Sequence, residues 1–285
     1  MSRQVHSTTG TISAWRLSLR PYGALFRIRF TNTLQYRAAA LAGLVTQFAW
    51  GFMYILAFAA FYRENPDAFP MTFQQTVSYI WMQQAFIALF FVWFWENSII
   101  ETMESGSIAY EMVRPMDLYG RWFTSTVANR MARTILRAVP ILVVAFILPM
   151  SFRLIFPADF QVIGLFFLSM VLSLGVVVAF SMLIYISAFF TINSLGTRIV
   201  VSVASDFLAG GYIPIPFFPD TFRTIVEFSP FGAMQNMPLL IFSGHLVGAD
   251  LVRGMALQVF WLVVLLIIGR IAMSRALKRV IVQGG

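Results

Sequence analysis

Charged side chains gather in one short stretch of an otherwise apolar chain. Residues 106–123, GSIAYEMVRPMDLYGRWF, carry Glu111, Arg114, Asp117 and Arg121. The first three recur at intervals of three residues, which places them close together on a helical surface. Two uses fit that spacing: local ion pairs on a solvated helix, or charges that fix the orientation of a docked protein partner. The residue types alone leave both readings open.

Sequence motifs for catalysis and metal binding are missing. The two histidines, His6 and His245, lie near opposite ends of the chain, so neither has a partner at metal-ligand spacing. The only lysine, Lys278, is followed by Arg279, whereas a phosphate-binding P-loop needs Lys followed by Ser or Thr. The absence of cysteine excludes disulfides and thiol chemistry. We expect this chain to carry no catalytic residue, no metal and no cofactor of its own.

Asp206 is an acid within an apolar run, where insertion of its carboxylate costs about 2.5 kcal/mol or more. In one reading it lines a permeation path and attracts a cationic substrate. In the other it accepts a hydrogen bond from Ser202 or a neighbouring helix, at a break prepared by Gly210 and Gly211.

Three more residues are candidates for a substrate path, and each has a plainer alternative. Phe94 and Glu96 end an aromatic apolar run, and Phe217 lies in a segment rich in proline and aromatic residues. Aromatic residues at span ends also form the ordinary belt at the membrane interface. The candidate substrate path therefore comprises Asp206, Glu96, Phe94 and Phe217.

Composition places these residues in a bilayer. Hydrophobic residues make up 59% of the 285 residues and charged residues only 11%. Soluble domains carry about 25% charged residues, so this chain cannot cover a water-facing surface. A helix needs about 20 residues to cross the hydrocarbon. We predict an all-α integral membrane protein with six transmembrane helices, at about residues 38–62, 74–96, 134–152, 162–190, 199–218 and 252–273.

The basic residues predict the orientation of these spans. With both termini in the cytoplasm, all but four of the 20 Lys and Arg fall on the cytoplasmic side, as the positive-inside rule requires. The net charge of +8 then reflects topology and contact with anionic lipid, and not binding of nucleic acid. Residues 97–133 become a cytoplasmic loop, and residues 212–252 an extracellular or re-entrant segment.

The N-terminal residues 13–37 predict an amphipathic helix in the headgroup layer. Trp15, Leu19 and Tyr22 alternate with arginines, and Pro21 is expected to bend the helix. A basic, disordered tail is the alternative. In the loop 97–133, Gly106 can end one helical segment. A short helix over residues 112–119 with mixed charge then suits a protein partner better than lipid.

Two segments resemble a known family. ESGSIAYEMVRPMDLYGRWF, residues 104–123, and NRMARTILRAVPILVVAF, residues 129–146, are similar to ABC-2 type transporter permeases, in particular the viologen-exporter-like branch. The resemblance implies one transmembrane domain over residues 1–285 with a type V exporter-like permease fold. It also implies a separate ATP-binding subunit that holds ATP and Mg²⁺, and a second permease, with a heterodimer favoured.

The same resemblance implies that the loop contains a coupling helix that docks in a groove of the ATP-binding subunit. The expected coupling residues are Glu111, Arg114, Pro115, Asp117 and Tyr119. Met112, Met116 and Leu118 are expected to supply the apolar contact.

The function expected from these patterns is ATP-driven export across a prokaryotic plasma (inner) membrane. The substrate is expected to be an amphiphilic or lipophilic compound, with a cation as one option. A membrane-embedded lipid-modifying enzyme and a non-transporting membrane scaffold are the alternatives. The enzyme needs clustered polar residues at membrane depth, for which only Asp206, Gln83 and Gln84 are available.

Overall fold

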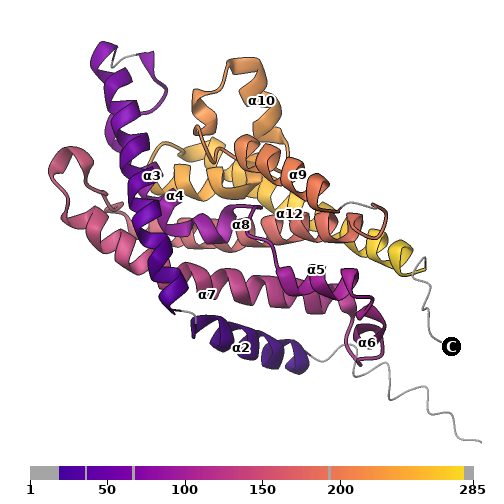
Figure 1. Ribbon diagram of the computed structural model, residues 1–285. Helices are drawn as coiled ribbons and strands as arrows, with labels where there is room; N and C mark the ends of the chain where they lie inside the picture. The colour runs from indigo at the N-terminus through magenta and orange to yellow at the C-terminus, as the bar shows by residue number, and fades with distance from the viewer. Residues whose placement is uncertain (1–18, 36, 66–67, 192–193, 279–285) are drawn as a thin grey trace, which may run out of the picture.

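The structure, a computed structural model, describes residues 19–35, 37–65, 68–191 and 194–278. Over these ranges the regular elements are all helical, and no strand occurs (Figure 1). Six helices occupy the apolar runs of the sequence. They are α3 (Arg37–Glu64), α4 (Phe73–Phe90), α7 (Leu118–Ile147), α8 (Phe160–Ser187), α9 (Ser194–Leu208) and α12 (Gly248–Leu277).

Three of the described helices are long and apolar enough to cross a membrane: α3 from Ala42 to Glu64, α8, and α12. Of the other three, α7 has 30 residues but carries arginines in its first half, α4 has 18 residues, and α9 has only 15. The chain is therefore an all-α membrane protein, and its prediction of six spans stays a prediction.

The fifth predicted span, residues 199–218, is only partly helical. Helix α9 ends at Leu208, because Gly210 takes the left-handed conformation with φ +81° and Pro214 and Pro216 follow soon after. A short 3₁₀ turn, η3 (Ile215–Phe217), continues the chain.

The core of the molecule is the packing of α4, α7, α8, α11 (Met237–Phe242) and α12. Glycines let some of these helices approach closely, as small residues do in membrane bundles. A Cβ added to Gly269 of α12 would lie 2.6 Å from the hydroxyl of Tyr119, at the start of α7. Helix α3 packs across α4 and α7 (Figure 1).

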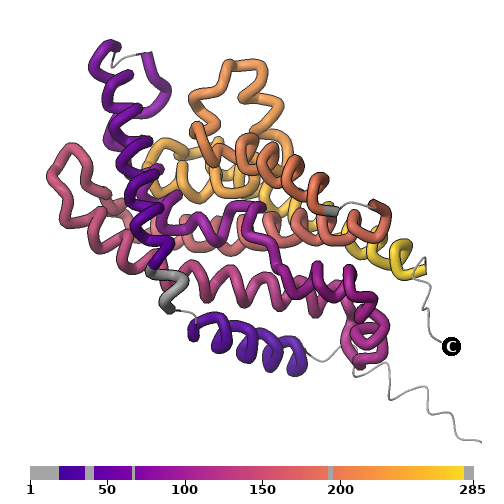
Figure 2. The backbone as a smooth tube through the Cα atoms, in the orientation of Figure 1, coloured from indigo at the N-terminus to yellow at the C-terminus, as the bar shows by residue number. Residues whose placement is uncertain are grey.

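The second predicted span is broken. Helix α4 ends at Phe90, and residues 91–96 run without helical structure to α5 (Asn97–Glu104), as Figure 2 shows. We call residues 91–96 the α4–α5 break. The prediction of one span over residues 74–96 is therefore wrong at its C-terminal end.

The predicted cytoplasmic loop is largely helical. Gly106, with φ +71°, lets the chain turn from α5 into α6 (Ile108–Met112), in agreement with its predicted role as a helix end. The prediction of a short helix over residues 112–119 is wrong, because α6 ends at Met112 and α7 begins only at Leu118. Pro115 lies in the connection between them. Helix α7 then runs unbroken through the predicted loop boundary at residue 133.

Helix α2 (Arg20–Leu34) lies along the first half of α7 (Figure 1). Pro21 lies in its first turn, where the missing N–H of proline leaves no helical hydrogen bond unmade. The predicted bend at Pro21 stays a prediction, because it depends on residues that lie outside the described ranges. Thr33 donates a hydrogen bond to the side-chain oxygen of Asn129 in α7 at 2.7 Å. Residues 13–18 of the predicted interfacial helix lie outside the described residues.

Residues 212–252 fold into short elements over one end of the bundle (Figure 1). They are η3, α10 (Asp220–Phe228), η4 (Gly232–Asn236) and α11. All six residues of α11 are buried, packed against α8 and α4. The predicted extracellular or re-entrant location of this segment stays a prediction.

Candidate functional site

The most exposed apolar side chains near the charged stretch lie at the end of α6. Tyr110 is 78% exposed and Val113 is 82% exposed, and Met112, Arg114 and Pro115 are exposed beside them. We call these five residues the α6 tip. Isolated exposed apolar residues are common on proteins, but contiguous ones mark interaction surfaces. The charge pattern drew attention to Arg114, whereas Tyr110 was missed because its exposure depends on where α6 ends.

The other side of α6 is fixed to α7 by charge. The carboxylate of Glu111 pairs with the guanidinium of Arg121 at 2.5 Å, and the same guanidinium donates a hydrogen bond to the Glu111 carbonyl at 2.9 Å. Arg121 is buried, and burial lowers its pKa while Glu111 opposes that shift. Arg114 approaches Glu111 only at 3.7 Å and remains largely exposed. The charged stretch therefore anchors α6 and leaves the α6 tip uncovered.

Two predicted coupling residues lie away from the α6 tip. The carboxylate of Asp117 accepts a hydrogen bond from the backbone N–H of Gly120 at 2.7 Å, so Asp117 caps the N-terminus of α7. Tyr119 is 2% exposed and packs against Gly269 of α12. Burial raises the pKa of Tyr119 to about 12. Both residues hold α7 in place, whereas Glu111, Arg114 and Pro115 belong to α6 and its connection.

A second cluster of charge holds the α4–α5 break. The guanidinium of Arg130, in α7, donates hydrogen bonds to the carbonyls of Phe91 at 2.8 Å, and of Leu89 and Phe94 at 3.2 Å. These carbonyls have lost helical partners because α4 ends at Phe90. An unpaired backbone group in hydrocarbon costs several kcal/mol, so a buried arginine is well used here.

Asp206, in α9, serves the N–H groups of the same break. Its carboxylate accepts hydrogen bonds from the backbone N–H of Val92 at 2.7 Å and of Trp93 at 3.3 Å. This geometry supports the reading in which Asp206 bonds to a neighbouring segment. Among the described residues no hydrogen bond joins Asp206 to Ser202, and the Ser202 hydroxyl accepts from the indole of Trp95 at 2.8 Å. These partners could not be predicted from the sequence, since they lie more than a hundred positions away and are backbone groups.

Glu96 lies in a polar junction at the end of the break. Its carboxylate accepts a hydrogen bond from the side chain of Asn129 at 2.5 Å and lies 4.0 Å from Arg133. Asn129 also accepts the hydrogen bond from Thr33, so this junction joins α2, α7 and the break. The structure thus gives Glu96 a positioning contact within the fold.

A cavity of about 540 Å³ opens beside the break. Asp206 and Phe94 line it, whereas Glu96 and Phe217 do not. Phe217 packs instead on Phe58, with ring centroids 5.1 Å apart. The remaining lining residues come from α3, α4, the break, α7 and the α9 end: Gly43, Thr46, Gln47, Trp50, Tyr54, Gln84, Ile87, Phe91, Trp93, Arg137, Val203, Gly211 and Tyr212. Of the four predicted path residues, the structure brings two together.

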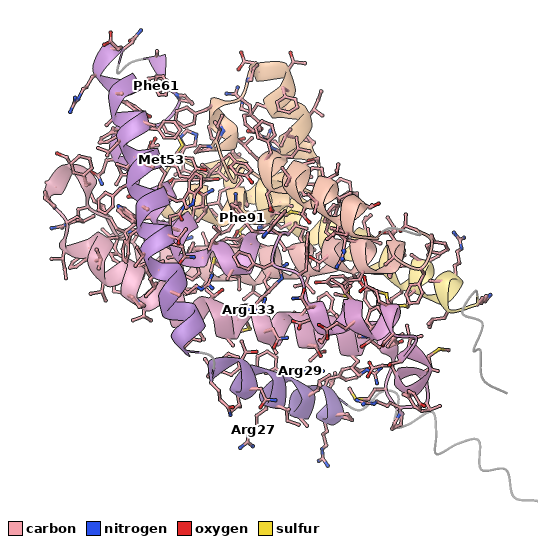
Figure 3. All side chains as sticks on the ribbon, viewed as in Figure 1. Arg27, Arg29, Met53, Phe61, Phe91 and Arg133 are labelled. Carbon is pink, nitrogen blue, oxygen red and sulfur yellow. The ribbon has the colours of Figure 1, made fainter. Side chains whose placement is uncertain are left out.

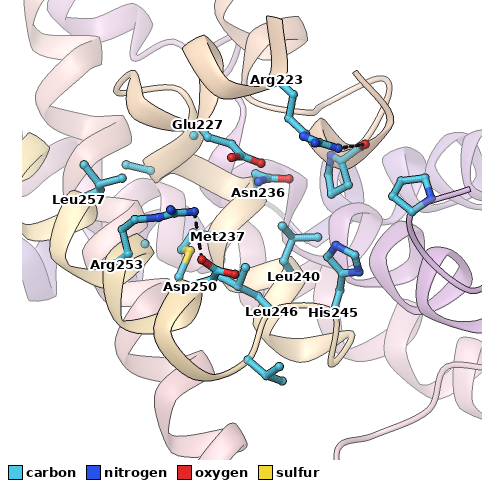
Figure 4. A pocket seen from close by; sticks show the side chains of 16 residues that line it. Arg223, Glu227, Asn236, Met237, Leu240, His245, Leu246, Asp250, Arg253 and Leu257 are labelled. Atoms are coloured by element: carbon cyan, nitrogen blue, oxygen red, sulfur yellow. Dashed lines mark hydrogen bonds and ion pairs between the residues drawn. The ribbon is translucent and has the colours of Figure 1, made fainter. Parts of the chain in front are cut away.

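A smaller cavity, of about 290 Å³, lies between α10, α11 and the start of α12 (Figure 4). Arg253 pairs with Asp250 at 3.2 Å, and Arg223 pairs with Asp220 at 2.8 Å. Glu227 lies between the two arginines in Figure 4. Burial raises the pKa of Glu227, and Arg223 and Arg253 oppose that shift. The sequence analysis did not single out these side chains.

Comparison with known proteins identifies the chain. The model of the family described as ABC-2 family transporter protein matches residues 48–284, which is most of the chain and includes the α4–α5 break, α6 and the smaller cavity. It also includes the lining of the larger cavity except Gly43, Thr46 and Gln47. No curated protein and no solved structure matches it. The resemblance seen in the sequence is thus confirmed. The chain belongs to the ABC-2 transporter family and is a membrane permease of an ABC transporter.

Proposed function

We propose that this chain is the permease subunit of an ATP-driven exporter that moves an amphiphilic or lipophilic compound across a prokaryotic plasma membrane. A separate subunit binds ATP and Mg²⁺ and docks on the α6 tip. A second permease, favoured to be a different chain, completes the transporter. Both termini and the α6 tip face the cytoplasm.

The α6 tip is the observation that carries this proposal. Tyr110, Met112 and Val113 present apolar surface beside the guanidinium of Arg114. Protein interfaces are enriched in Tyr, Met and Arg at their centres. The salt bridge between Glu111 and Arg121 holds α6 against α7, so a force applied to the α6 tip is transmitted to α7.

The basic residues support the orientation. In Figure 3, Arg27 and Arg29 of α2 and Arg133 of α7 lie toward the lower end of the molecule, whereas Met53 and Phe61 of α3 lie toward the upper end. Helix α6 lies at the lower right of Figure 1. Because cytoplasmic segments collect arginine, this distribution favours a cytoplasmic α6 tip.

Helix α7 supplies a route from the α6 tip to the large cavity. Its N-terminal turns hold α6 through Arg121, and its middle holds the break through Arg130. The break also receives Asp206 from α9, which lines the cavity. We propose that ATP-driven movement of the docked subunit shifts α7 and thereby changes the cavity between inward-facing and outward-facing shapes.

Co-purification tests the docking surface. The permease is purified in detergent with candidate ATP-binding proteins encoded beside it, as wild type, as Val113→Asp and as Val247→Asp. Val247 is 67% exposed and lies just before the first residue of α12. The second half of α12 packs on the start of α7, so Val247→Asp adds the same charge at the end of α12 that is far from α7 and serves as the control. We expect Val113→Asp to weaken binding and coupled ATPase activity about tenfold and Val247→Asp to leave both unchanged.

Two results would overturn the proposal. If no ATP-binding protein binds the wild type, the subunit assignment fails. If a protein binds at the α6 tip but nucleotide changes nothing in the permease, the chain is a scaffold and not an exporter.

A further inference from the structure

The large cavity beside the α4–α5 break has the dimensions and walls of a ligand site. Its volume of about 540 Å³ lies inside the range of roughly 300–1,000 Å³ that is usual for small-molecule pockets. Six aromatic side chains line it: Trp50, Tyr54, Phe91, Trp93, Phe94 and Tyr212. Flat aromatic walls suit a planar apolar body.

The carboxylate of Asp206 is not free to attract a cation in this cavity. One oxygen accepts from the N–H of Val92 and the other from the N–H of Trp93. Moving Asp206 toward a ligand would leave these two amides unpaired. Its negative charge is also balanced across the break by Arg130, which binds the carbonyls of Phe91 and Phe94.

Arg137 is the charged group that remains available. It comes from α7, lines the cavity, and lies with its guanidinium carbon 5.8 Å from the centroid of the Phe94 ring. Its Nε atom is buried without a hydrogen-bond partner, and among the described residues no carboxylate lies within ion-pair distance of it. With Asp206 and Arg130 balanced, the charge facing the cavity is positive.

Two buried amides complete the polar part of the wall. Gln47, from α3, and Gln84, from α4, are each more than nine-tenths buried, and both line the cavity. The side-chain oxygen of each has no hydrogen-bond partner in the part of the chain that the structure describes. Leaving such groups unpaired costs about 1–3 kcal/mol each. A ligand with polar substituents on its ring system would pair with them.

We propose that this cavity binds planar aromatic anions, with the anionic group on Arg137, the ring system between the aromatic walls, and Gln47 and Gln84 bonded to polar ring substituents. This inference rests on the proposed export function and names the substrate class of that permease. It replaces the cation suggested by the sequence, because that suggestion depended on a free Asp206 carboxylate.

Binding to the purified permease in nanodiscs of zwitterionic lipid tests this assignment without any ATP-binding subunit. Three probes share one ring system: anthracene-2-carboxylate, anthracene-2-carboxamide and 2-(aminomethyl)anthracene. Energy transfer from tryptophan reports binding, since Trp50 and Trp93 line the cavity, and empty nanodiscs give the lipid background. We expect the carboxylate to bind about tenfold more tightly than the aminomethyl compound, as a single charge-assisted contact typically provides.

Variants of Arg137 identify the source of the preference. Arg137→Gln should remove the preference for the carboxylate and leave carboxamide binding unchanged, which shows that the cavity still forms, and Arg137→Lys should keep part of the preference. Arg153→Gln is the matched control, because Arg153 also lies over a phenylalanine ring, at 5.2 Å from Phe146, but outside this cavity.

Three results would overturn the inference: equal or tighter binding of the aminomethyl compound, a preference that survives in Arg137→Gln, or no binding of any probe. These binding measurements need no ATP-binding subunit, so they remain valid if the docking test on the α6 tip fails. The two proposals can therefore fail separately.

Discussion

The α6 tip and the α4–α5 break are both short interruptions of the helical bundle that nearby charged residues hold in place. The charged residues do so in different ways. At α6, the salt bridge of Glu111 with Arg121 lies on the inner side and apolar residues face outward. At the break, Arg130 and Asp206 are fully buried and bind backbone groups. In both regions the buried charged side chains, Arg121 near α6 and Arg130 and Asp206 at the break, bind other groups of the protein and not solvent.

The contrast between the two regions shows how a chain with few charges distributes them. Backbone groups that leave a helix within hydrocarbon need strong partners, and ionised side chains are the strongest available. At α6 the guanidinium of Arg121 bonds a single backbone carbonyl, that of Glu111, and its ion pair with the Glu111 side chain orients one short helix. Charged residues in this permease therefore mark places where the backbone must be positioned, and the contact surfaces lie beside them.

Removal of Arg130 has the largest expected effect. Arg130→Met leaves the carbonyls of Phe91, Leu89 and Phe94 without their donor and Asp206 without its balancing charge. We expect a loss of about 3 kcal/mol or more in the free energy of unfolding, measured by denaturant titration in detergent. Arg114→Met, an exposed arginine in the other region, should change stability by less than about 1 kcal/mol. Equal losses would remove the distinction between the two regions.

Asp206 tests whether the break or a substrate needs the acid. Asp206→Ala removes both acceptors and should cost about 1–3 kcal/mol, whereas Asp206→Asn keeps one acceptor oxygen and should cost less. Denaturant titration of both variants gives the order. If both variants unfold like the wild type but lose probe binding, Asp206 is a substrate contact and the comparison is wrong.

The packing of the start of α7 against α12 depends on one close contact. Gly269→Ala would place a Cβ 2.6 Å from the Tyr119 hydroxyl, so we expect a loss of about 1–3 kcal/mol in stability. Gly164→Ala is the control, because nothing lies within 4 Å of its added Cβ. Adding Tyr119→Phe removes the clashing hydroxyl, which has no partner among the described residues, and should restore part of the stability. Absence of any rescue would mean that the clash lies elsewhere.

Substitution of Glu227 has the smallest expected effect. Glu227 is a half-buried carboxylate that accepts no hydrogen bond from a backbone N–H in the described structure. Burial raises the folded-state pKa of Glu227, so the folded state favours the protonated side chain. The protein therefore loses stability as the pH rises through that pKa. Glu227→Gln should therefore stabilise the protein by a few tenths of a kcal/mol at pH 7. The gain should vanish below about pH 3, where Glu227 is protonated in both states. A variant that is less stable than the wild type at pH 7 would show that Glu227 is paired.

The sequence predicted the helical class and the family, which the structure and the family model confirm, whereas the docking region around Glu111 stays a prediction. Apolar runs and the segment around Glu111 carried this information, because hydropathy and local spacing are properties of neighbouring residues. It also predicted the turn at Gly106, since a glycine that ends a helix has a local cause.

The parts that the sequence did not predict depend on distant contacts. No proline or glycine near Phe90 indicates that the helix ends there. The break is held by Arg130 and Asp206, which come from two other helices. Tyr119 was expected at the docking surface, but the gap at Gly269 of α12 buries it. Nothing in the sequence around Arg137 indicates a cavity, and only the fold shows that this side chain lines one.

Site-specific cross-linking shows whether an ATP-binding protein docks on the α6 tip. The chain has no cysteine, so Val113→Cys places a single photoreactive maleimide on the α6 tip, and Val247→Cys places the same group at the opposite end. We predict that illumination in native membranes attaches an ATP-binding protein to the Val113→Cys variant only, and that vanadate with ATP changes the yield. A yield confined to position 247, or lipid adducts alone at position 113, would contradict it.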